Sequence, residues 1–243
     1  MTEIARRMPS DPSSSDQASS SPGLGAEKIR RDAPISPQVY ALLRAAIIQS
    51  RLRPGAQIFE ARLAERLGVS RTPLRAALQL LTKEGLIETR PQVGSIVAPV
   101  DPKKIHSAVF CRSALETAVV RRLAAMQKPD LDRLSRILAL QAECTARDDY
   151  LAFFEVDEEF HRLLAELADV PEAWALVLSN KSHVDRAWLG LQSANPGRAA
   201  IAYREHLLIV DAIRNKDADL AADLMHRHVT SALDIVDVDG RRN

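Results

Sequence analysis

The segment from Leu63 to Leu78 most constrains the fold of this chain, because two short helical patterns meet there at a single glycine. Residues 63–67 carry apolar side chains at helical spacing, and Gly68 suits the left-handed conformation that often ends a helix. Ser70 is a favourable N-cap for a following helix, and Pro73 falls in its first turn, where a missing N–H costs little. The sequence therefore predicts two helices joined by a tight turn.

The start of the second helix carries side chains that suit contact with DNA. Arg71 and Arg75 lie four residues apart and share one helical face, and Thr72 projects from the same end. The planar guanidinium of arginine can pair with guanine bases or with phosphates. In a helix-turn-helix the second helix enters the major groove by its N-terminal end, so we expect Ser70, Arg71, Thr72 and Arg75 at the DNA. An ordinary helical hairpin with solvated arginines is the alternative.

The flanking segments favour the DNA-binding interpretation. Residues 39–48 form an amphipathic helical pattern that stops before Arg53-Pro54-Gly55. Residues 84–90 run from a helix into a short strand, residues 91–94 form a turn, and residues 95–98 alternate like a returning strand. Together these patterns predict three helices followed by a β-wing.

The segment from about residue 35 to residue 100 resembles the winged-helix domain of the GntR family of bacterial transcription regulators. The resemblance rests on "IIQSRLRPGAQI", "LAERLGVSRTPLRAAL" and "EGLIETRPQVGSIVAPV". It implies that the recognition-helix residues contact double-stranded operator DNA and that the wing tip at Gly94 approaches the minor groove. It also makes Arg62, on the preceding helix, a candidate for a phosphate contact.

The charges divide the 243-residue chain into parts of opposite sign. Residues 35–100 contain nine Lys and Arg against four Asp and Glu, whereas residues 101–243 contain nineteen against twenty-three. A basic module joined to an acidic one fits a protein that binds DNA at one end only. We therefore predict a tail over residues 1–34, a DNA-binding domain over 35–100 and a second domain over 101–243.

Nothing in the composition indicates export or a membrane. Residues 1–34 are rich in serine and lack the apolar middle of a signal peptide, which predicts a disordered tail. No apolar run reaches the about 18 residues that a membrane span needs. Cys111 and Cys144 are too few for a disulfide framework. We expect a cytoplasmic protein with reduced thiols and no membrane partner.

The second domain is predicted to be an all-α bundle of six helices, so the chain as a whole should be mainly α. Apolar residues recur at helical spacing throughout, and breaks occur near Pro129, Asp148, Pro171, Gly197 and Lys216. The expected helices span residues 102–127, 130–147, 149–169, 171–192, 198–215 and 217–236.

Polar residues that interrupt these helical patterns suggest a metal site. Asp157 and His161 lie four apart on one helical face, and His206 and His228 lie on two later helices. One carboxylate and three imidazoles are a competent ligand set for Zn²⁺, Ni²⁺ or Mn²⁺. Spacing alone leaves the choice open, because the chain holds three more histidines: His106, His183 and His226.

Residues 105–234 resemble the FCD ligand-binding domain of the FadR subfamily of GntR regulators. The matching pieces are "CRSALETAVVRRLA", "FFEVDEEFHRLLAELA" and "YREHLLIVDAIRNKDADLAADLMHRHV". The resemblance implies a divalent metal ion held by Asp157, His161, His206 and His228. It also implies that Arg112 holds the carboxylate of an effector, although a surface ion pair with Glu116 would explain the same residue.

Further residues are candidates for the effector pocket. His183 and Arg186, in "SHVDRAWLGL", share one side of the predicted fourth helix, and Asn180 lies just before them. The favoured function is a homodimeric transcription regulator, a repressor by preference, that responds to a small carboxylic acid. The alternatives are a metal-dependent enzyme and a DNA-binding protein whose metal is purely structural.

Overall fold

The computed structural model describes residues 29–127, 129–192 and 197–233. Its first helix is α1 (Ile35–Ile48). A tail is expected over residues 1–34, and its residues 1–28 lie outside the described part of the chain. The described residues before α1 are tied to that helix, because Oε1 of Gln38, on α1, accepts the N–H of Arg30 at 2.8 Å.

The N-terminal domain contains the two predicted helices on either side of the glycine turn, α2 (Glu60–Leu67) and α3 (Arg71–Lys83). Gly68 has φ +62° and ψ +33°, the left-handed conformation expected for it. Leu74 and Leu81 of α3 are fully buried and pack against α1. The apolar face of α3 thus anchors the helix and leaves Arg71, Thr72 and Arg75 of its N-terminal half exposed to solvent.

A small antiparallel sheet completes this domain. Its strands β1 (Gln57–Ile58), β2 (Ile87–Arg90) and β3 (Gly94–Val97) lie in the order β1-β3-β2. Arg90 pairs with Gly94 at the hairpin that forms the wing, where Gly94 has φ +89°. The sequence analysis missed β1, because two residues are too few to show an alternating pattern.

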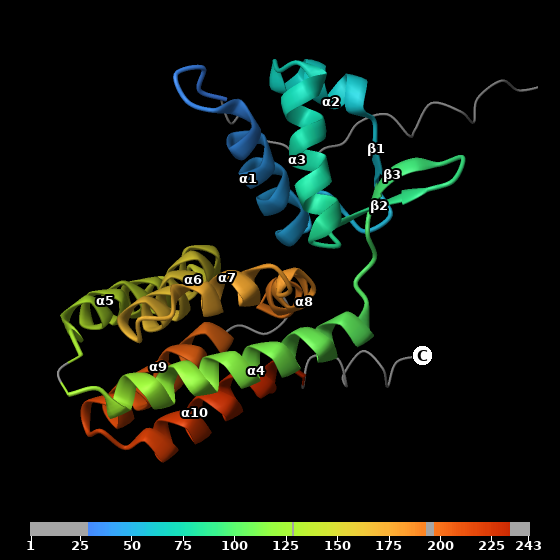
Figure 1. Ribbon diagram of the computed structural model, residues 1–243. Coiled ribbons are helices and arrows are strands. Elements are labelled where there is room, and N and C mark those ends of the chain that lie inside the picture. The colour runs from blue at the N-terminus through green and yellow to red at the C-terminus, as the bar shows by residue number, and fades with distance from the viewer. Residues whose placement is uncertain (1–28, 128, 193–196, 234–243) are drawn as a thin grey trace, which may run out of the picture.

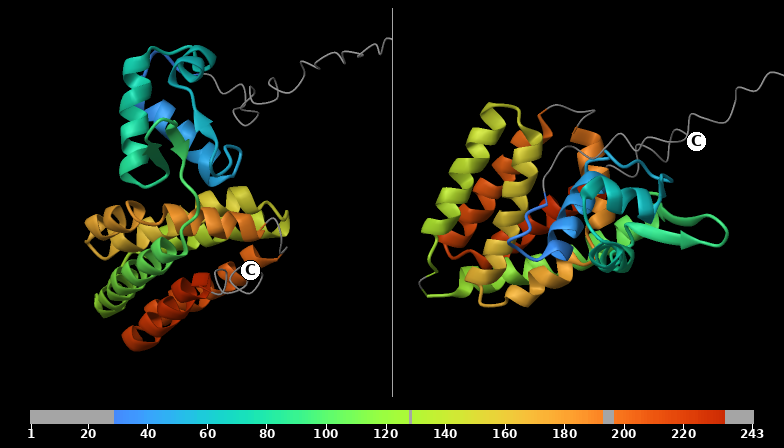
Figure 2. Two further views of the ribbon diagram at one scale, coloured as in Figure 1. Left: turned by 90° about the vertical axis from the view of Figure 1, so that its right-hand side faces the viewer. Right: turned by 90° about the horizontal axis from the view of Figure 1, so that it is seen from above.

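The remaining helices form the C-terminal bundle, beneath the winged-helix domain in Figure 1. They are α4 (Pro102–Ala125), α5 (Asp132–Ala146), α6 (Tyr150–Leu167), α7 (Pro171–Leu178), α8 (Ser182–Gln192), α9 (Arg198–Arg214) and α10 (Ala218–Thr230), followed by the 3₁₀ turn η1 (Ser231–Leu233). The helix α10 lies alongside α4 and α9, and α5 lies alongside α6 and α9 (Figures 1 and 2). The fold is therefore mainly α, as predicted.

The prediction of one helix over residues 171–192 is wrong, because two helices occupy this range. After Leu178 the backbone N–H groups of Asn180 and Lys181 both bond to the carbonyl of Val177. The Asn180 side chain also donates to the carbonyl of Leu176 at 2.9 Å. Such side-chain bonds to the backbone compete with helix continuation, so α7 ends at Leu178 and α8 begins at Ser182. The expected extension of the last helix to residue 236 lies outside the described residues after residue 233.

The two domains meet along α8. The Ser182 hydroxyl donates to the carbonyl of Glu84 at the end of α3, at 2.8 Å. Leu189 of α8 joins the hydrophobic core of the N-terminal domain. Among the described residues, no helix combines the length and the apolar character that a membrane crossing requires.

Candidate metal centre and DNA-binding surface

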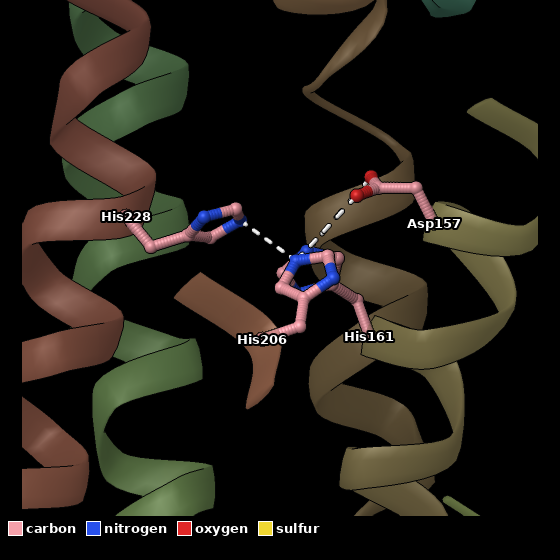
Figure 3. Close-up of side chains that lie close together, drawn as sticks. All are labelled: Asp157, His161, His206 and His228. Atoms are coloured by element: carbon pink, nitrogen blue, oxygen red, sulfur yellow. Dashed lines mark hydrogen bonds and ion pairs between the residues drawn. The ribbon is translucent and has the colours of Figure 1, made fainter. Parts of the chain in front are cut away.

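Three helices bring the four predicted metal ligands to one point inside the bundle. Asp157 and His161 come from α6, His206 from α9 and His228 from α10 (Figure 3). One ligand atom of each residue lies within 4.8 Å of those of the other three. His161 and His206 are fully buried, whereas Asp157 and His228 are partly exposed. The arrangement is thus a compact group with an open side.

Polar partners orient two of the imidazoles. Nδ1 of His206 lies 2.9 Å from Oε1 of Gln141, and Nδ1 of His228 lies 2.7 Å from Oε2 of Glu205. Both partner oxygens are acceptors, so each Nδ1 carries a proton and each Nε2 is directed at the centre of the cluster. A histidine that donates its outer N–H to a carboxylate or carbonyl in this way is typical of metal sites.

The inward-facing atoms fit a divalent cation. Nε2 of His206 lies 3.2 Å from Nε2 of His228 and 3.6 Å from Oδ1 of Asp157. Nε2 of His161 is buried and makes no hydrogen bond. Burial, together with His228 and His161, lowers the pKa of His206 well below its usual value and favours the neutral ring. Nitrogen and carboxylate donors grouped in this way suit Zn²⁺, Ni²⁺ or Mn²⁺.

The third imidazole faces a buried carboxylate. Nδ1 of His161 lies 2.6 Å from Oε2 of Glu116, whose Oε1 accepts the Nε–H of Arg112 at 2.7 Å. Burial would raise the pKa of Glu116, but Arg112 and then His161 outweigh it and hold the pKa well below its usual range. The pair of Arg112 with Glu116 therefore exists, but it is buried rather than on the helix surface that the sequence suggested.

A cavity of about 220 Å³ opens beside this cluster. Asp157, His228 and Arg112 line it together with the side chains of α8 and α9. Its other charged residues are Lys181, Asp185, Arg198 and Glu205, and its aromatic residues are Phe154 and Trp188. A cavity of this size with both cationic and apolar walls can hold a small organic acid.

Of the four predicted effector residues, the structure brings only Arg112 to the cavity. His183 and Arg186 face the N-terminal domain: Nδ1 of His183 accepts the N–H of Asp101 at 3.2 Å, and Arg186 donates to the carbonyl of Ala98 at 2.8 Å. Burial, then nearby Lys104 and Arg186, lower the pKa of His183 to about 4. His183 and Arg186 thus share the side of α8 that faces the N-terminal domain rather than the cavity.

Asn180 also lies outside the cavity, since its exposed side chain bonds to Leu176 and Ser179 at the end of α7. The sequence analysis missed Lys181, Asp185 and Glu205 as cavity residues. The four-residue spacing of Lys181 and Asp185 was a visible signal for an ion pair, but spacing does not say which face of a helix meets a cavity.

The predicted DNA-contact residues all lie exposed on the N-terminal domain: Arg62, Ser70, Arg71, Thr72, Arg75 and Gly94. The N-terminal half of α3 and the wing therefore offer an exposed surface. Nε of Arg75 lies 2.7 Å from Oε2 of Glu60 on α2. The Arg62 guanidinium stacks 5.3 Å from the ring centre of Phe59. Ser70 occupies the N-cap position of α3, but its side chain makes no capping hydrogen bond.

Comparison with known proteins matches both domains. Residues 35–97 match the model of the bacterial regulatory proteins of the gntR family, and residues 108–231 match the FCD domain. The HTH-type transcriptional repressor RspR of Escherichia coli K12 is 33% identical over 198 residues, which cover 81% of this chain and 86% of that protein. An uncharacterized HTH-type regulator of Streptomyces ambofaciens is 36% identical over 202 residues, covering 82% and 84%.

Solved structures share the fold. A crystal structure of a GntR transcriptional regulator from Rhodococcus sp. RHA1 superposes with a TM-score of 0.70 at 25% identity, over 83% of this chain and 97% of that one. Escherichia coli McbR/YncC gives a TM-score of 0.71 at 21% identity, over 86% and 98%, which concerns the fold alone. The chain therefore belongs to the gntR family of bacterial regulatory proteins, carries an FCD domain and is a DNA-binding transcription regulator.

Proposed function

We propose that this regulator is a homodimeric repressor whose operator binding changes when a small carboxylic acid occupies the cavity beside a divalent metal ion. The observation that carries the proposal is the position of the cavity. Its wall includes Asp157 and His228 of the metal cluster and the buried cation Arg112. An acid in this cavity reaches the metal ligands and the arginine at once.

Asp157, His161, His206 and His228 would hold the ion. The ion would supply Lewis-acid attraction for a carboxylate or hydroxycarboxylate in the adjoining cavity. The chain's own residues keep the site ready: Gln141 and Glu205 hold two imidazoles with Nε2 inward. Arg112 keeps Glu116 ionised beside His161.

The contacts of the neighbouring carboxylates favour regulation over catalysis. An enzyme needs a base that is free to take a proton from substrate. Glu158 is ion-paired with Lys181 at 2.7 Å, and Glu205 is held by His228. Both therefore serve structural contacts in the described part of the chain. An effector regulates by binding one arrangement of the protein better than another.

A thermal-shift screen with small mono-, di- and hydroxycarboxylic acids, with and without a chelator, tests the proposal. A ligand of the native state raises the melting temperature, and chelation should abolish the rise. The stabilising acid should then change operator affinity by roughly 5- to 150-fold in an electrophoretic shift assay. Metal in the purified protein with no acid-dependent change in operator affinity would instead favour a structural metal.

A further inference from the structure

The helix α8 separates the cavity from the N-terminal domain. Lys181, just before α8, and Asp185 line the cavity. On the other side, Ser182 and Arg186 donate hydrogen bonds to backbone carbonyls of the N-terminal domain. Figure 1 shows α8 directly beneath α1 and α3. The same short segment therefore touches both the cavity and the DNA-binding domain.

A buried network of charges crosses this boundary. Nζ of Lys181 lies 2.7 Å from Oε1 of Glu158 and also bonds to Asp185. Nη2 of Arg44, on α1, lies 3.1 Å from Oδ2 of Asp185 and 3.7 Å from Oε1 of Glu158. Nε of Arg44 lies 3.4 Å from Oε2 of Glu84. Lys181 and Arg44 thus share the same two carboxylates from opposite sides of the domain boundary.

Among the side chains that pair directly in this network carboxylates outnumber cations, and the buried Arg112 also acts on Glu158 and Asp185. Glu84, Glu158 and Asp185 bring three carboxylates, whereas Lys181 and Arg44 bring two cations. The side chains of Lys181 and Asp185 are each 3% exposed, so solvent screens them little. Burial raises the pKa of Asp185 and Lys181 opposes this shift. A further anion that binds Lys181 therefore competes for its charge with the carboxylates that hold Arg44.

Lys181 can also bind a ligand. An ammonium group has three N–H donors, and two carboxylates engage Lys181. Nζ lies 5.1 Å from the ring centre of Phe154, which is itself a wall of the cavity. The remaining donor suits an acidic group on the ligand, at a point distinct from the metal ligands and Arg112.

We propose that Lys181 binds an acidic group of the effector, and that this contact weakens the hold of Asp185 and Glu158 on Arg44, which docks the DNA-binding domain on α8. The proposal rests on the proposed function for the existence of an acidic effector. The docking network itself is a property of the chain without ligand, so the two parts are tested separately.

The ligand-free test compares the full-length Lys181→Met, Arg44→Gln and double variants with the unsubstituted protein. Each single variant should speed hydrogen exchange in α1 and at the start of α8, and should change operator affinity by roughly fivefold or more. The double variant should change it no further, because both substitutions break one connection. Arg133→Gln, which removes an exposed ion pair with Glu166 within the bundle, is the control.

Unchanged exchange in α1 in both single variants, or additive effects in the double variant, would overturn the transmission route. Melting curves confirm that the variants fold. Arg44→Gln keeps the test decisive if the burial of Lys181 makes its substitution too costly, because Arg44 lies at the boundary with its side chain 14% exposed.

The ligand test uses calorimetry on the metal-loaded protein with L-malate, a small acid that carries a second carboxylate for Lys181. Lys181→Met should weaken malate binding by about tenfold or more, as expected for a lost charge-assisted bond. Arg44→Gln, which keeps Lys181, should bind malate at least as tightly as the unsubstituted protein. Equal affinity in Lys181→Met, or no malate binding to the unsubstituted protein, overturns this subsite. The proposed function fails separately if no acid of the screen alters operator binding.

Discussion

Nε2 of His206 lies 3.2 Å from Nε2 of His228, although both rings direct Nδ1 at an acceptor. Both outer nitrogens are engaged, so the two Nε2 atoms are the atoms that these rings offer to the centre of the cluster. Oδ1 of Asp157, which lies 3.6 Å from Nε2 of His206, adds a carboxylate to the same group.

The first prediction concerns the metal ligands. His206→Ala should remove most of the bound metal, whereas His226→Ala should retain it. His226 is exposed and its Nδ1 lies 2.7 Å from the Ser113 hydroxyl, on the surface of α4. Elemental analysis of the purified proteins measures the difference. Equal metal content in the two variants would contradict the ligand set.

A second prediction concerns the outer partner of His228. Glu205→Gln keeps the size of the side chain but removes the negative charge 2.7 Å from Nδ1. Loss of such a partner typically reduces metal affinity by about 10- to 100-fold. Titration against a competing chelator gives the affinity, and Glu172→Gln, on the exposed start of α7, is the control. An unchanged affinity in Glu205→Gln would show that this carboxylate does not support the site.

Operator recognition gives the third prediction. Arg75→Ala should weaken specific binding by on the order of 1–3 kcal/mol, because the residue lies on the exposed N-terminal half of α3. Arg66→Ala, on α2, should have a smaller effect. An electrophoretic shift assay measures both. Full affinity in Arg75→Ala would mean that the Arg75 side chain serves its pair with Glu60 rather than DNA.

The fourth prediction concerns acid sensitivity at the domain boundary. The pKa of His183 is about 4 in the folded protein against 6.5 for the free side chain, so the unfolded chain binds a proton first as the pH falls. Stability is therefore lost on acidification below about pH 6.5, and His183 contributes about 2 kcal/mol of the loss between pH 7 and pH 5. Protonated Nδ1 can no longer accept the N–H of Asp101.

Chemical denaturation at both pH values measures this effect. His183→Gln should remove its share of the pH dependence in that window and leave the share of buried His206, while His226→Gln, at an exposed position, should leave the whole dependence in place. A His183→Gln protein that loses as much stability as the unsubstituted one would place the acid-sensitive group elsewhere.

Local chemistry in the sequence was sufficient to predict the two helices and the turn of the helix-turn-helix in the N-terminal domain. Gly68 and Pro73 act on their own backbone within a few residues, so the turn and the start of α3 were predicted before any tertiary contact was known. The strand β1 was not, because its two residues acquire strand structure only by pairing with β3.

The sequence by itself determined the mainly α fold and the four candidate metal ligands, the latter with the help of a family resemblance. Helical periodicity is a local property, and a four-residue spacing puts Asp157 and His161 on one face in any α-helix. Only the tertiary structure decided that α8 is a separate helix, that His183 and Arg186 face the N-terminal domain, and that Lys181 lies between the cavity and Arg44. The physical reason is that a helix has several faces, and packing against distant segments selects which of them meets a cavity and which meets another domain.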